Sequence, residues 1–186
     1  MSWFRNDRLS GDKATGRWAR LTAQIDETLS AATDPRTAFS EFSRLVESAF
    51  TIRKGFLALR EENQTRFLAI ASWKKGGERR SLSLLLPQTA SLFERVAETG
   101  QIYSEAFAEF FDGNRIERSL LFDHDTVSFM LRPLKHDARV VGLIGYSSDL
   151  PDAFVTIEDG RLDPAFDRLA AFLGRLQPDL SRVESA

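Results

Sequence analysis

No cysteine occurs among the 186 residues of the chain. This absence excludes disulfides, thiolate metal sites, a thiol nucleophile and a thioether-linked cofactor. It also fits a protein of the cytoplasm, which is the location we expect.

The sequence also lacks an excess of charge and a long apolar run. Its 25 Lys and Arg residues against 27 Asp and Glu residues give a net charge of −2, which supplies no field that would attract nucleic acid. The longest uncharged stretch, Ser81 to Phe93, has 13 residues and is interrupted by polar ones, and the N-terminal segment has no apolar signal core. We therefore expect neither nucleic acid nor a membrane as a partner.

The chain has enough apolar side chains for one core, at 42% hydrophobic and 11% aromatic residues. We expect a flexible tail at 1–16, an appended N-terminal helix at 17–33, one domain at 34–177 and a flexible C-terminal tail at 178–186. The appended helix is predicted by an apolar stripe at three- and four-residue steps, which consists of Trp18, Leu21, Ile25 and Leu29.

Two further helices are predicted by their N-terminal signals. The dipeptide Asp34-Pro35 supplies an N-cap and a proline at the first helical position, and opens a helix at 34–50. Asp163-Pro164 opens a last helix at 163–176 in the same way.

Between these helices the apolar pattern takes the period of strands. GFLALRE at 55–61 and RFLAIASW at 66–73 flank a polar turn and predict an antiparallel hairpin. Both faces of each run are apolar, so this hairpin is expected to be covered on both sides and to be central in its sheet. Two apolar runs around a short charged turn predict a second hairpin at 127–147.

The order of elements resembles that of the GAF domain, a sensory module related in shape to PAS domains. The local matches are AETGQIY at 97–103, where a helix end leads into a strand, and RPL at 132–134 followed by VVGLI at 140–144. The resemblance covers Asp34 to Leu176. It implies an α+β fold with a central antiparallel β-sheet, N- and C-terminal helices on one face, and a ligand pocket with a lid on the other.

The second hairpin is expected to form part of the pocket floor. A two-residue turn at His136-Asp137 places one face of large apolar residues, Phe129 among them, against the helices. The other face is expected to look into the pocket and consists of Ser128, Met130, Arg132, Gly145 and Ser147.

Arg132 is a charge out of pattern between apolar residues, and could hold a carboxylate or phosphate of a ligand. The alternative is a structural ion pair, or a strand-end residue that reaches water. Where the family has its lid, aromatic rings beside Arg115 could enclose a flat ligand, or could be plain core. The residues expected to contact a ligand are Tyr103, Phe111, Arg115, His124, Ser128 and Arg132. We expect Arg132 and Ser128 to share a cavity with Tyr103, Phe111 or His124.

Enzymatic chemistry is not expected. The cluster Asp123-His124-Asp125 resembles metal ligands or an acid–base pair, but on a strand only alternate residues face one way, so we favour a capping and loop role. In the GAF family, which the sequence resembles, bilin attachment and methionine sulfoxide reduction depend on cysteine. Cyclic nucleotide binding depends on an Asn-Lys motif, and SSDLPDAFVTIEDG at 147–160 does not contain it. We expect no metal and no cofactor.

Two functions remain open. The first is a non-catalytic sensory module that binds an unknown small molecule and signals to a partner protein through its terminal helices. The alternative is a degenerate GAF scaffold whose pocket is filled by its own side chains and which serves dimerisation or protein–protein interaction. An open cavity favours sensing, whereas a cavity filled by Phe107, Phe110 or Phe111 favours the scaffold. Because the stripe of the first helix must be buried somewhere, we also expect a homodimer formed through the terminal helices, unless that helix folds back on its own domain.

Overall fold

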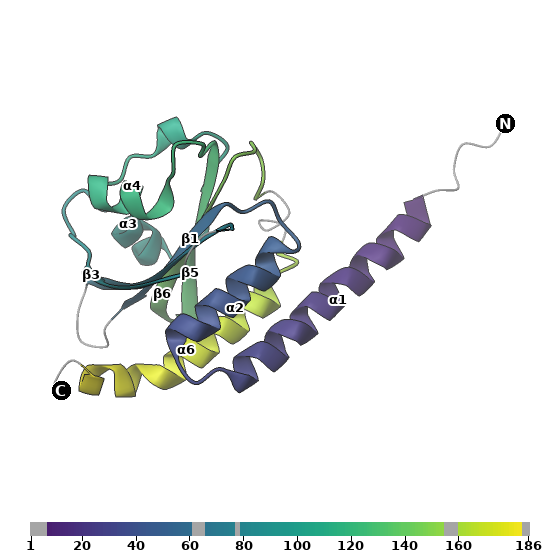
Figure 1. Cartoon of the computed structure of the whole chain (residues 1–186), viewed down its shortest axis with the longest axis horizontal. Helices are drawn as coiled ribbons and strands as arrows, with labels where there is room; N and C mark the ends of the chain where they lie inside the picture. Colours follow the sequence, from purple (N-terminus) through teal and green to yellow (C-terminus); the bar gives the residue numbers. More distant parts are fainter. Residues whose placement is uncertain (1–6, 61–65, 77–78, 155–159, 184–186) are drawn as a thin grey trace.

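A six-stranded antiparallel sheet separates two layers of helices (Figure 1). The computed structural model describes residues 7–60, 66–76, 79–154 and 160–183. The strands follow the order β3-β2-β1-β6-β5-β4 across the sheet. They are β1 (Lys54–Arg60), β2 (Phe67–Lys74), β3 (Arg80–Leu85), β4 (Tyr103–Glu105), β5 (Ser128–His136) and β6 (Arg139–Ser148). The expected α+β architecture is confirmed.

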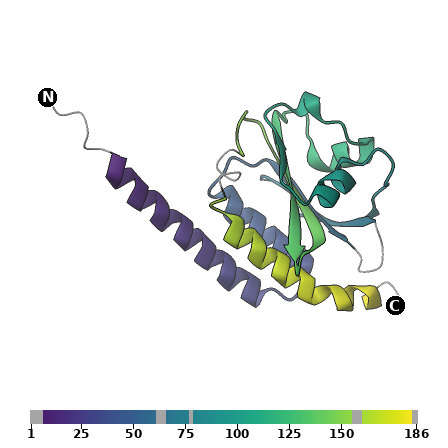
Figure 2. The same ribbon diagram turned by 180° about the vertical axis from the view of Figure 1, so that it is seen from behind.

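Each face of the sheet has its own set of helices (Figures 1 and 2). The helix face carries α1 (Asp7–Ala31), α2 (Pro35–Glu47) and α6 (Asp163–Val183). The lid face carries α3 (Leu92–Thr99), the short 3-10 helix η1 (Ala108–Phe110) and α4 (Arg115–Leu121). None of the helices in these described ranges has the length and apolar character needed to cross a bilayer.

The N-cap at Asp34 and the apolar stripe of the first helix, both read from the sequence, act in the helix layer as expected. The Asp34 carboxylate accepts hydrogen bonds from the backbone N–H groups of Arg36 and Thr37 and so caps α2. Three members of the apolar stripe on α1 are buried against the same core as α2 and α6: Leu21, Ile25 and Leu29. The stripe of the first helix is thus buried within its own chain.

Both predicted tails are wrong in part. The first helix begins at Asp7 rather than at residue 17, and its N-terminal half projects beyond the domain (Figure 2). The last helix continues to Val183, so residues 178–183 are helical. Residues 1–6 and 184–186, which complete the two expected tails, lie outside the described residues.

The first predicted hairpin is confirmed as the centre of the sheet. β1 lies between β2 and β6, and its five residues from Gly55 to Leu59 are all buried. Burial on both faces accounts for the lack of polar residues at alternate positions. The turn expected at 62–65 lies outside the described residues.

The second hairpin forms with a different register from the one expected. Its turn residues are Asp137 and Ala138. Their φ angles of 49° and 61° are both positive, as in the type I′ turns that commonly connect antiparallel strands. Lys135 then pairs with Val140, but Leu134 pairs with Gly142, so Val141 is an extra residue in β6.

This bulge reverses the faces of β5, because a shift of one residue moves every side chain to the other side of the sheet. Met130 and Arg132 therefore face the helices, whereas Phe129 and Leu131 face the lid. The expectation that Met130 and Arg132 belong to the pocket floor is wrong. On β6, Gly145 does face the lid, as expected, since a side chain there would meet Phe56 of the lid-face core.

Arg132 is a structural residue of the helix face. Its guanidinium Nη2 lies 2.5 Å from Oδ1 of Asp163, the first residue of α6, and its Cζ lies 4.3 Å from the centre of the Phe166 ring. The Arg132 side chain is only 9% exposed, so both contacts act in a poorly solvated place. The alternative of a structural ion pair is confirmed.

We predict that Arg132→Ala lowers the free energy of unfolding by about 3 kcal/mol, because the change removes the cation–π contact of a buried guanidinium and its ion pair with the half-exposed Asp163. The matched control is Arg53→Ala, whose ion pair with Asp149 lies at the surface and is worth less than about 1 kcal/mol. Urea denaturation measures both values. Equal losses in the two variants would show that the Arg132 contacts contribute no more than a surface pair.

Candidate functional site

The space between the sheet and the lid is filled by aromatic side chains. Phe56 of β1 stacks on Phe93 of α3 with ring centroids 4.7 Å apart and planes 8° apart. Three further rings, Phe111, Phe122 and Phe129, meet pairwise edge to face at 5.0 to 5.6 Å. These rings occupy the region in which the sequence resemblance places a ligand.

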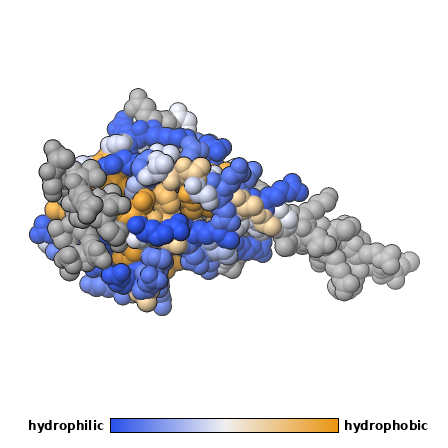
Figure 3. All heavy atoms as spheres, turned by 90° about the horizontal axis from the view of Figure 1, so that it is seen from below, coloured by the Kyte–Doolittle hydropathy of each residue, from blue (hydrophilic) through white to orange (hydrophobic). Residues whose placement is uncertain are grey.

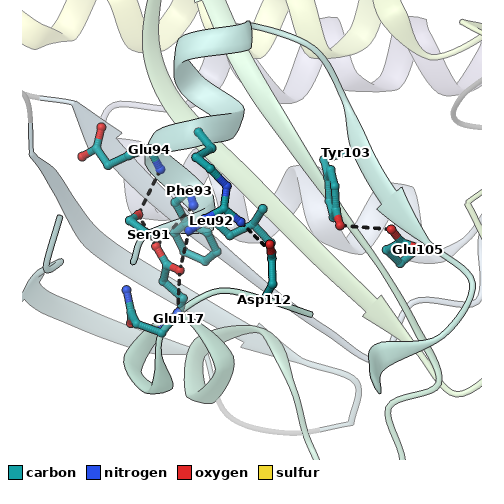
Figure 4. Close-up of polar contacts among 10 residues, drawn as sticks. Ser91, Leu92, Phe93, Glu94, Tyr103, Glu105, Asp112 and Glu117 are labelled. Carbon is teal, nitrogen blue, oxygen red and sulfur yellow. Dashed lines mark hydrogen bonds and ion pairs between the residues drawn. The ribbon is translucent and has the colours of Figure 1, made fainter. Parts of the chain in front are cut away.

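The two lid helices are joined by one buried carboxylate, that of Glu117 (Figure 4). Its Oε2 accepts hydrogen bonds from the N–H groups of Leu92 (3.0 Å) and Asn114 (3.2 Å). Its Oε1 accepts hydrogen bonds from the Phe93 N–H (3.2 Å) and the Ser91 hydroxyl. One α4 side chain thus satisfies free N–H groups at the N-terminal ends of both α3 and α4.

The other end of α4 is held by the sheet. The Lys54 ammonium on β1 donates hydrogen bonds to the backbone carbonyls of Ser119 (2.7 Å) and Phe122 (2.8 Å). A cation at this position donates hydrogen bonds to the last carbonyls of the helix, and its charge interacts favourably with the negative end of the helix dipole. Burial lowers the pKa of Lys54, although the neighbouring Asp123 opposes that effect.

A hollow of about 440 Å³ lies beside α4, and we name it the rim pocket. Its size is within the range of small-molecule sites. It is lined by Ala108, Arg115, Arg118, Ser119, Phe122, Asp123, His124 and Thr126.

The rim pocket is predominantly cationic. The Arg118 guanidinium lies over the Phe122 ring at 5.0 Å from its centre and over the Phe111 ring at 6.0 Å. An arginine stacked in this way can still offer its in-plane N–H groups to a carboxylate or phosphate. Within the described ranges, no acidic side chain forms an ion pair with Arg115 or Arg118.

The one carboxylate among the lining residues, Asp123, is already neutralised. Its oxygens lie 2.8 Å from the Lys74 ammonium and 3.6 Å from that of Lys54. Burial acts to raise the pKa of Asp123, but the two lysines outweigh it and hold the pKa below its usual value. Asp123 therefore stays ionised and paired, and the arginines determine the charge that the pocket presents.

The structure places the six predicted ligand residues in separate parts of the molecule. Arg115 and His124 lie together in the rim pocket. Ser128 lines another hollow, of about 200 Å³, and donates a hydrogen bond to the Leu150 carbonyl. Arg132 faces the helices, as described above.

The two remaining residues belong to the lid-face packing. Phe111 is part of the aromatic filling, and Tyr103 packs at its edge. The Tyr103 hydroxyl donates to Glu105 Oε1 at 3.0 Å, and burial together with that carboxylate raises the pKa of Tyr103 to about 12. The predicted cavity shared by Arg132 and Ser128 with Tyr103, Phe111 or His124 is therefore wrong.

Asp123, His124 and Asp125 do not form a strand. They lie in the turn before β5, where Asp123 faces the lysines and His124 Nε2 lies 3.1 Å from Asp125 Oδ2. The part of the chain that the structure describes contains no group of three or more residues placed to hold a metal ion.

The sequence reasoning missed Arg118, Lys54 and Glu117. A signal for Glu117 was present, since Asn114 followed three residues later by a glutamate is a capping box, and the structure contains it. No local pattern indicates that the same carboxylate also reaches α3.

The fold is found among solved structures. Comparison with family models and with curated sequences gives no match. Among solved structures, the GAF domain of an Acinetobacter phosphoenolpyruvate-protein phosphotransferase matches with a TM-score of 0.70 and 16% identity, over 88% of this chain and 97% of that one. The GAF domain of a Coxiella burnetii phosphoenolpyruvate-protein phosphotransferase matches with a TM-score of 0.70 and 16% identity, over 90% of this chain and 98% of that one. The chain has the GAF-domain fold.

A third match corrects one expectation. The free methionine-R-sulfoxide reductase of Neisseria meningitidis, solved in complex with its substrate, matches with a TM-score of 0.63 and 12% identity, over 98% of both chains. The expectation that the chain is not an enzyme is overturned, because enzymes share this fold.

Proposed function

We propose that the chain is a GAF-type regulatory module that binds a small anion, a phosphate or carboxylate compound, in the rim pocket. The observation that carries the proposal is the pair Arg115 and Arg118, which face a hollow of about 440 Å³ without an acidic partner among the described residues. Phe122 and Ala108 add an apolar wall, as small-molecule sites commonly have.

The sheet offers a route from this pocket to the terminal helices. Phe122 lines the pocket and contacts Phe129 of β5, with ring centroids 5.1 Å apart. On the opposite face of β5, Arg132 contacts Asp163 and Phe166 of α6. We propose that an event at the pocket reaches α6 along this path, and that α6 and α1 pass it to a partner protein.

A second candidate function rests on a different observation. The interior beneath the lid is filled by Phe111 and its neighbours, which is the arrangement expected of a scaffold used for association. The stripe on α1 gives this candidate no support, since it is buried in the chain's own helix layer. Figure 3, a view of the molecule from below, shows hydrophobic residues exposed between hydrophilic ones.

We propose that a second copy contacts the N-terminal half of α1, which projects beyond the domain (Figure 2).

For the anion site we predict saturable binding of pyrophosphate, which Arg115→Gln and Arg118→Gln each weaken about tenfold, because each removes one charge-assisted contact. The matched control is Arg20→Gln, an exposed arginine on α1, which should leave the affinity unchanged. Calorimetric titration at fixed ionic strength measures all four proteins. The same affinity in all of them, or no binding to the wild type, would refute the proposal.

For association we predict that the full chain sediments at about twice its 21.0 kDa mass, and that removal of residues 1–15 shifts it towards monomer. This truncation keeps Trp18, Leu21 and Ile25, so the helix layer stays covered. Sedimentation equilibrium at micromolar concentration is the measurement. A full chain that remains monomeric would contradict this candidate.

A further inference from the structure

We infer that Glu117 is the positioning residue of the rim pocket: its buried carboxylate fixes the rotation of α4 about its axis and thereby aims Arg115 and Arg118 at a bound anion. The inference rests on the proposed function and deepens it. Glu117 lies on the buried side of the helix and would not touch the anion.

α4 cannot hold its own orientation. It has seven residues, fewer than an isolated helix needs for stability in water. The pocket-lining residues of α4 are Arg115, Arg118 and Ser119, which share one side of the helix at three- and four-residue spacing. The direction of this side depends on what holds the opposite side.

Glu117 is the directional anchor at the N-terminal end of α4, and the Lys54 ammonium holds the C-terminal end through the Ser119 and Phe122 carbonyls. Leu120 and Leu121 also pack inward, but apolar contacts tolerate rotation better than hydrogen bonds do. Each oxygen of the Glu117 carboxylate accepts two hydrogen bonds, one of them from the first turn of α3. Three donors are backbone N–H groups and the fourth is the capping Ser91 hydroxyl, so together they restrict the orientation of the carboxylate. Figure 4 shows the contacts to Ser91, Leu92 and Phe93.

A glutamine at this position tests the claim with little change in shape. Its amide oxygen can accept hydrogen bonds, but its NH₂ group would face two donors. The matched control is Tyr146→Phe, which removes a buried hydrogen bond to Ser43 at 2.9 Å on the helix face, away from the lid. Both changes remove buried polar contacts, and only Glu117→Gln touches α4.

The experiment compares wild type, Glu117→Gln and Tyr146→Phe at a temperature at which circular dichroism shows all three folded. We expect pyrophosphate to bind Glu117→Gln about tenfold more weakly than wild type, and Tyr146→Phe within twofold. Hydrogen exchange of the amides of Arg115–Leu121 should be about tenfold faster in Glu117→Gln and unchanged in the control. If Glu117→Gln does not fold, Ser91→Ala removes one donor and should weaken binding about threefold.

The outcomes separate the two claims. Glu117→Gln that binds within twofold of wild type, with unchanged exchange of the α4 amides, overturns the positioning role. Wild type that binds no pyrophosphate overturns the proposed function, and the exchange result then decides whether Glu117 holds α4 at all.

Discussion

The Glu117 carboxylate is the interaction on which the lid depends. A fully buried carboxylate is costly unless its oxygens are hydrogen-bonded, and here four donors from two segments supply those bonds. The benefit is mutual, because α3 and α4 are both too short to be stable alone and their N-terminal N–H groups need acceptors. With Lys54 at its other end, α4 is held between α3 and the sheet.

This constraint explains how the aromatic packing beneath the lid and the rim pocket arise together. With α3 and α4 held down, their aromatic neighbours close over β1 and β5, and Gly145 leaves room for the Phe56 ring. The charged residues of α4 are then left on its outer side, where Arg118 rests on the edge of the same aromatic cluster. The filling of the interior and the exposure of the arginines are two results of one arrangement.

The order of elements and the central hairpin could be predicted, because period, capping residues and burial on both faces of β1 are local properties of the sequence. The facing of Arg132 could not be predicted, since it depends on one extra residue, Val141, in the partner strand. Arg115 was expected at the lid and His124 among the ligand contacts, whereas Arg118 was missed because its role requires the Phe122 ring beside it. Glu117 shows the same limit, in that its capping box is local and its contact with α3 is not.

We propose that an anion binds in the rim pocket and not among the aromatic rings beneath the lid. Amide chemical shifts, followed by two-dimensional NMR during titration with pyrophosphate, locate the binding residue by residue. Binding in the rim pocket should shift the amides between Arg115 and Thr126 and leave those of Phe56 and Gly145 unaffected. Shifts centred on Phe56 and Gly145, with α4 unaffected, would place the ligand in the interior and contradict binding at the rim.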